Sequence, residues 1–65
     1  MNNSRLEART YYEEKTKNMS LEEKYEWIKT KLFYIEVDNY IEDKEEWREY
    51  LQIKDEIVEE IKNGK

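Results

Sequence analysis

The chain has 65 residues, of which 12 are basic and 17 are acidic, so its formal net charge is −5. It contains no cysteine and no histidine, which excludes disulfides, thiolate metal sites and the commonest general base at neutral pH. A chain of this length (1–65) forms one domain at most, and such a domain depends on good helix packing or on a partner chain for stability.

The charge is unevenly distributed along the chain. Residues 1–35 carry 7 basic and 6 acidic side chains, whereas residues 36–65 carry 5 basic and 11 acidic ones. A negative surface repels nucleic-acid phosphates and anionic lipids and attracts basic protein surfaces. We therefore expect no direct nucleic-acid contact. Because no apolar run is long enough for a membrane span or a signal peptide, we also expect no membrane contact and a cytoplasmic location.

The near absence of turn-forming residues predicts the fold class. There is no proline, and the only glycine is Gly64. A β-rich protein of this size would need several tight turns, which Gly, Pro and Asn supply. The sequence therefore predicts an all-α fold.

The first predicted helix lies near residues 4–17 and is the weakest. Ser4 and Glu7 have the spacing of an N-terminal capping box. The apolar side chains of this segment do not share one helical face. We therefore expect this helix to pack loosely against the others or to form fully only on binding. Those apolar side chains are Leu6, Ala8, Tyr11 and Tyr12.

The second predicted helix lies near residues 21–37, after a break at Asn18-Met19. Ser20 and Glu23 form another capping box. Five apolar residues follow one another at spacings of 4, 3, 4 and 3, which is the pattern of a seam that packs on another helix. They are Leu21, Tyr25, Ile28, Leu32 and Ile35.

The third predicted helix lies near residues 44–62. Asp43, with Glu46 three residues later, can cap its start, and Gly64 is placed to cap its end. Six of its apolar residues fall within about 120° of arc, as expected for a helix that docks on one surface. They are Trp47, Tyr50, Leu51, Ile57, Val58 and Ile61. An antiparallel hairpin of the second and third helices would bury both seams.

The connection between these two helices leaves an alternative open. Residues 38–43 contain neither glycine nor proline, so one long kinked helix paired with a second chain would also satisfy the pattern. In either arrangement the apolar surface favours a homodimer.

Several apolar side chains lie away from the hairpin seam. Phe33, Val37 and Tyr40 lie on the opposite side of the second helix, and Trp27 and Tyr34 flank its seam. Either the first helix covers one of these groups and the rest is ordinary surface, or some of these residues contact another molecule. Aromatic side chains are enriched in the centres of protein interfaces, so we include all five among the predicted interface residues.

One lysine interrupts the apolar stripe of the third helix. Lys54 lies in the middle of that stripe. It either extends its aliphatic part along the core with the ammonium in water or pairs with a carboxylate across an interface. We therefore include it among the predicted interface residues.

The third helix also carries a row of carboxylates opposite its apolar stripe. Like charges at i,i+4 weaken an isolated helix slightly. The row is either a solvated face that favours solubility or an anionic surface presented to a basic partner. Its members are Glu45, Glu49, Asp55, Glu56, Glu59 and Glu60. Because no glycine-containing calcium loop is present, we expect no metal site.

These patterns predict a binding protein rather than an enzyme. No phosphate-binding loop, nucleophile elbow or zinc motif is present, and no cofactor is implied. The leading hypothesis is a small acidic helical protein that binds and occupies a basic or aromatic-accepting surface of another protein, as an inhibitor or regulator. The alternatives are a DNA mimic that sequesters a nucleic-acid-binding protein, and a structural homo-oligomer. In its general composition the chain resembles small accessory proteins of bacteriophages and mobile elements, which implies a target among host or defence proteins.

Overall fold

Three helices make up the structure. The computed structural model describes residues 3–37 and 41–64, and its helices are α1 (Ser4–Thr16), α2 (Leu21–Glu36) and α3 (Lys44–Asn63). Each bound lies within one residue of the predicted one. No strand occurs in the described residues, so the predicted all-α class is confirmed.

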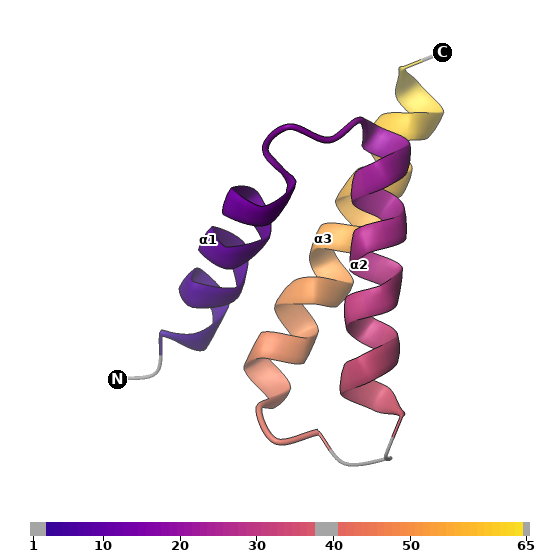
Figure 1. The fold of residues 1–65 in the computed structure, drawn as a ribbon. Coiled ribbons are helices and arrows are strands. Elements are labelled where there is room, and N and C mark those ends of the chain that lie inside the picture. Colours follow the sequence, from indigo (N-terminus) through magenta and orange to yellow (C-terminus); the bar gives the residue numbers. More distant parts are fainter. Residues whose placement is uncertain (1–2, 38–40, 65) are drawn as a thin grey trace.

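Helix α3 is the element on which the other two pack. Helices α1 and α3 run in the same direction and α2 runs against both, with α1 and α2 lying on different sides of α3 (Figure 1). The predicted α2–α3 hairpin is therefore confirmed, and the alternative of one long helix is wrong for this chain. The predicted break at Asp38-Asn39 lies outside the described residues. Near it, the indole Nε1 of Trp47 donates to Glu36 Oε2 at 2.7 Å and joins the two helices.

Two of the three predicted N-terminal helix caps are present. The backbone N–H of Glu23 donates to Ser20 Oγ at 3.3 Å, and that of Ser20 donates to Glu23 Oε1 at 2.9 Å. Asp43 Oδ1 accepts from the N–H groups of Glu45 and Glu46 at 3.1 and 3.2 Å. The predicted capping box at Ser4 is wrong, because Ser4 is the first helical residue and its hydroxyl donates to Asp43 at the start of α3.

The end of α3 is capped through its backbone. The Gly64 N–H donates to Glu60 O at 2.8 Å, and Gly64 has φ −84°. The predicted cap is therefore present. It does not depend on the left-handed conformation that favours glycine.

The core is small and draws on all three helices. The predicted α2 seam is confirmed, since Ile28 and Leu32 are buried and its other members pack around them. The α3 stripe is wider than predicted, because Ile53 is only 1% exposed although it lies outside the predicted arc. Val58, which the stripe included, is half-buried. The buried apolar residues are Ala8, Tyr12, Ile28, Leu32, Tyr50, Ile53 and Ile57.

The expectation that the first helix packs loosely is wrong. Ala8, Tyr12 and Thr16 follow one another at i, i+4 and i+8, and all three are buried. The Thr16 hydroxyl donates to Tyr12 O at 2.7 Å, so burial leaves it with a partner. Two of these residues are small or polar, which is why a search for large apolar side chains did not find this face. Arg9 of α1 pairs with Glu49 and Glu56, which lie at i−4 and i+3 from Ile53 on α3, so docking of α1 on this side explains why the buried stripe of α3 is wide.

Among residues 3–37 and 41–64, no helix combines the length and the apolar character needed to cross a bilayer.

The buried position of Ile53 generates a prediction about stability. Replacing Ile53 by alanine is expected to lower the free energy of unfolding by about 2–4 kcal/mol, because it opens a cavity where α1 meets α3. A core of this size supplies only about 3–5 kcal/mol in total, so unfolded protein should be detectable without denaturant.

Urea denaturation followed by circular dichroism provides the measurement. Leu6→Ala serves as the control, because Leu6 is 67% exposed and its truncation should change stability by less than about 0.5 kcal/mol. Equal losses in the two variants would contradict the assignment of Ile53 to the core.

Candidate functional site

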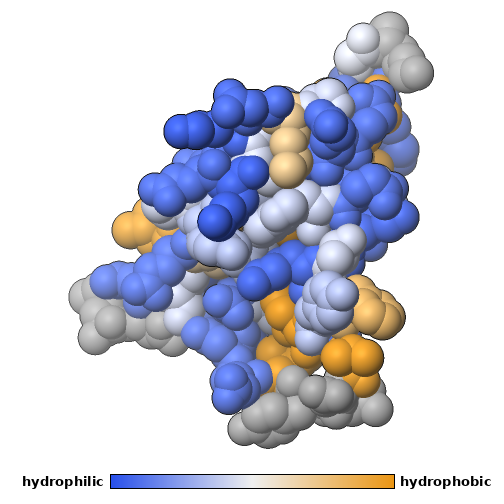
Figure 2. Space-filling model, in the orientation of Figure 1, coloured by the Kyte–Doolittle hydropathy of each residue, from blue (hydrophilic) through white to orange (hydrophobic). Residues whose placement is uncertain are grey.

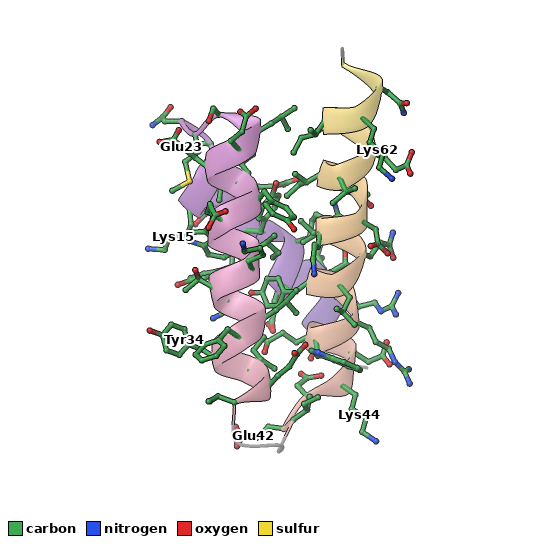
Figure 3. The ribbon with its side chains drawn as sticks, turned by 90° about the vertical axis from the view of Figure 1, so that its right-hand side faces the viewer. Lys15, Glu23, Tyr34, Glu42, Lys44 and Lys62 are labelled. Atoms are coloured by element: carbon green, nitrogen blue, oxygen red, sulfur yellow. The ribbon has the colours of Figure 1, made fainter. Side chains whose placement is uncertain are left out.

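An exposed apolar surface lies at the C-terminal end of α2. Phe33, Tyr34 and Val37 are 60%, 69% and 53% exposed, and the rings of Phe33 and Tyr34 meet edge to face at 5.6 Å. We call these three residues the outer patch. Figure 2 shows orange surface at the lower end of α2, and in Figure 3 the Tyr34 side chain points away from α3. Tyr40, predicted to belong to the same surface, lies outside the described residues.

Trp27 differs from the outer patch because it joins the three helices. Its ring lies 5.9 Å from that of Tyr11, 5.8 Å from that of Tyr12 and 6.3 Å from that of Tyr50. These are favourable separations for tilted or edge-on aromatic pairs. Trp27 is half-buried, so one side of it supports the core while the rest faces an opening.

That opening is an apolar hollow between α1 and α2, which we call the aromatic groove. It has a volume of about 620 Å³ and lies open to solvent. Carboxylates lie along the part nearest the start of α2, and aromatic rings form its walls. Its lining residues are Tyr11, Met19, Glu22, Glu23, Glu26, Trp27, Thr30, Lys31 and Tyr34. Because Tyr34 belongs to both surfaces, the aromatic groove continues into the outer patch.

Lys31 lies towards the C-terminal end of α2 in the aromatic groove, and its ammonium group contacts aromatic rings. Its ammonium lies 5.2 Å from the ring centre of Tyr11 and 5.7 Å from that of Tyr50, within the range of a cation–π interaction. Lys15 lies over the same Tyr11 ring at 5.5 Å. Lys54, the other lysine singled out in the sequence, lies on α3; it is half-buried and forms no ion pair with the described residues.

The predicted acidic surface is partly taken up by contacts within the chain. Arg9 of α1 reaches two carboxylates of α3: its Nη2 lies 2.7 Å from Glu49 Oε2, and its Nη1 lies 2.8 Å from Glu56 Oε1. Arg5 pairs with Glu45 at 2.9 Å. Glu49 is buried at 7% exposure, so its predicted place on the surface is wrong. These three carboxylates hold α1 on α3 and thereby position one wall of the aromatic groove.

The other predicted acidic residues remain on the outside. Asp55, Glu59 and Glu60 are exposed and make no ion pair with any residue that the structure describes. Nowhere in the described ranges do three or more carboxylates come together as ligands for a metal ion. Only three of the six predicted acidic residues are therefore free of the arginines of α1 and available to imitate the phosphates of a nucleic acid.

Two carboxyl groups are stabilised in their charged form by these contacts. Hydrogen bonds from the Ser4 hydroxyl and from backbone N–H groups of α3 lower the pKa of Asp43. The Arg9 guanidinium lowers the pKa of Glu56. In contrast, burial raises the pKa of Tyr50 to about 12, so this core side chain stays neutral at physiological pH.

Most residues that line the aromatic groove were not among the predicted interface residues. The prediction included Trp27 and Tyr34 but not Tyr11, Met19 or Lys31. The available signal was the spacing of Ala8, Tyr12 and Thr16, which defines the docked face of α1 and leaves Tyr11 at its edge. Once α1 is placed on α3, Tyr11 must face α2.

Comparisons with known proteins identify no relative. The sequence matches no protein-family model, and neither a curated protein nor a solved structure is similar to it. The geometry of the surfaces therefore carries the functional argument.

The Arg9 contacts generate a second stability prediction. Arg9→Met is expected to lower the free energy of unfolding by about 2 kcal/mol, because it leaves the buried carboxylate of Glu49 without its charged partner. The double variant Arg9→Met/Glu49→Leu should recover most of this loss, since a buried ion pair and an apolar pair of similar size are nearly equivalent.

Urea denaturation of the two single variants and the double variant measures the coupling between the residues. Additive losses would contradict a direct role of Arg9 in compensating the Glu49 charge.

The lowered pKa values predict a loss of stability in acid. Because the pKa of Glu56 is below that of the unfolded chain, its contribution is complete above the unfolded value, about pH 4–5. It disappears as the pH falls through the folded value. Glu56→Gln should therefore be less stable than the wild type at pH 7 and should decline less steeply below pH 5. Urea denaturation at a series of pH values tests this, and equal slopes would contradict the assignment.

Proposed function

We propose that this chain is a small protein-binding module that acts by occupying a surface of another protein, in the manner of an inhibitor or regulatory subunit. The observation that carries the proposal is the exposure of the outer patch. Three large apolar side chains stand more than half exposed on α2, although the core of this small protein buries only seven apolar residues among those described. Exposed clusters of this kind mark interaction surfaces.

The composition of the patch supports the same conclusion. Phe33 and Tyr34 present rigid rings that lose little conformational freedom on binding. They lie on a helix held by its N-terminal capping box and by α3, so the surface is organised before a partner arrives. A preformed surface of this kind binds with a smaller entropic penalty than a segment that folds on contact.

The contacts of α3 favour this function over nucleic-acid mimicry. A mimic needs carboxylates that are free to replace phosphates. Glu45, Glu49 and Glu56 are instead engaged by Arg5 and Arg9 of the same chain, so their arrangement is explained by the docking of α1.

Affinity capture with patch variants tests the proposal. Wild-type protein and Phe33→Glu/Tyr34→Glu are used as baits in a bacterial lysate, with Leu6→Glu as the matched control. Leu6 is 67% exposed but lies on α1, so its replacement changes a similar side chain on a different surface. The wild type and the control should retain the same partner, and the double variant should lose it while keeping its helical circular dichroism.

Sedimentation velocity over a wide range of concentrations separates a partner protein from a second copy. The homodimer expected from the sequence is compatible with the proposal if it forms through a face other than the outer patch. A dimer that Phe33→Glu/Tyr34→Glu dissociates would assign the outer patch to self-association instead. Retention of the captured partner by the double variant would show that binding uses another face.

A further inference from the structure

We infer that the aromatic groove receives a basic amphipathic helix of the partner protein. This inference rests on the proposed function, since it assigns the chemistry of the partner. The groove supplies what such a segment needs: an apolar floor, sufficient length and a negatively charged edge. Each property follows from residues at defined positions.

The arrangement of the helices leaves a place for one more helix. Helices α1 and α2 both pack on α3, and they diverge from the loop that joins them (Figure 1). The half-exposed face of Trp27 and the rings of Tyr11 and Tyr34 line the resulting space. A helix laid there would cover these rings and complete a four-helix arrangement.

The dimensions fit a helical segment. The groove follows α2 from Glu22 to Tyr34, which is about 18 Å at a rise of 1.5 Å per residue. That length accommodates about three turns of a guest helix. Apolar residues of the guest at i, i+3, i+4 and i+7 would meet the rings, which is the usual pattern of recognition in a helical groove.

The charge of the groove selects a basic guest. Glu22, Glu23 and Glu26 lie along its edge. Glu23 also accepts from the Ser20 N–H at 2.9 Å, and Glu26 lies 3.4 Å from Lys29 Nζ, but all three carboxylates are exposed to solvent. Lys31 is the one cation among the lining residues. Lys31 is already held between the rings of Tyr11 and Tyr50. The edge therefore presents carboxylates that attract lysine or arginine and repel an acidic segment or a nucleic acid.

A second copy of the chain does not have the required chemistry. Its net charge is −5, and none of its three helices is basic: α1 has three basic and three acidic residues, α2 has three and four, and α3 has four and seven. Two copies would also repel each other through their acidic surfaces. The charge complementarity therefore points to a different protein.

Synthetic peptides provide the probe. The first is an amphipathic helix of about 15 residues built from leucine and lysine at helical spacing, and the second carries glutamate in place of lysine. Isothermal titration calorimetry on the full wild-type chain measures affinity. The variant Trp47→Phe leaves Trp27 as the single tryptophan, so its fluorescence reports whether the peptide enters the groove.

Two charge variants separate local recognition from overall charge. Glu22→Lys/Glu26→Lys alters the groove, whereas Asp55→Lys/Glu59→Lys alters exposed positions of α3 outside it. Both pairs are spaced i,i+4, and both change the net charge by the same amount. We expect the lysine peptide to bind the wild type and the α3 variant and to shift the Trp27 emission. Affinity for the groove variant should fall about tenfold or more, and the glutamate peptide should not bind.

Equal binding of the lysine peptide to the two charge variants would overturn the inference, because attraction would then depend on net charge alone. Binding without any change in Trp27 emission, or a dimer dissociated by the groove variant, would also overturn it. If no peptide binds while capture through the outer patch persists, the groove assignment fails and the proposed function stands. Loss of patch-dependent capture would instead contradict the proposed function itself.

Discussion

The position of α1 depends on the contact that Arg9 makes with Glu49 and Glu56 of α3. Helix α1 contributes only three buried side chains, too little apolar area to hold a 13-residue helix on its own. The planar guanidinium reaches two carboxylates at once, and this geometry suits arginine better than lysine. By holding α1 beside α3, Arg9 also keeps Tyr11 opposite Trp27. The position of this wall of the aromatic groove therefore depends on the contact between Arg9 and α3.

The same contact explains why the acidic row of α3 tolerates its own repulsion. Glu45 and Glu49 are spaced i,i+4, an arrangement that weakens an isolated helix. In the folded protein each of them faces an arginine of α1, and Arg5 and Arg9 have the same spacing of four. Because the two helices run in the same direction, equal spacings on both keep the pairs in register. The stability of α3 is thus linked to the docking of α1. Glu45 and Glu49 serve to hold the two helices together.

Sequence patterns predicted the three helices and the pairing of α2 with α3. They did not predict how α1 packs on α3. Ser20 and Asp43 marked two helix starts, and the repeat that contains Ile28 and Leu32 identified the hairpin. The docked face of α1 was not visible, because Ala8 and Thr16 have little apolar area and their burial depends on α3. Glu49 was placed on the surface for the same reason: a carboxylate is buried only where a specific partner compensates its charge, and that partner lies 40 positions away in the chain. The groove could not be predicted until these long-range contacts were known.

The aromatic residues are divided between the core and the surface, and this division determines which rings a partner could contact. Tyr12 and Tyr50 are buried, Trp27 is half-buried between them, and Tyr34 stands outside. Because Trp27 and Tyr34 both line the aromatic groove, the groove lies between the aromatic core and the outer patch. A partner that enters the groove would contact side chains already fixed by packing, so binding would not need to order them. It would also cover Tyr11 and Lys31 and exclude water from their cation–π contact, which strengthens as the local dielectric falls. Occupation of the groove would therefore stabilise the position of α1 on α3.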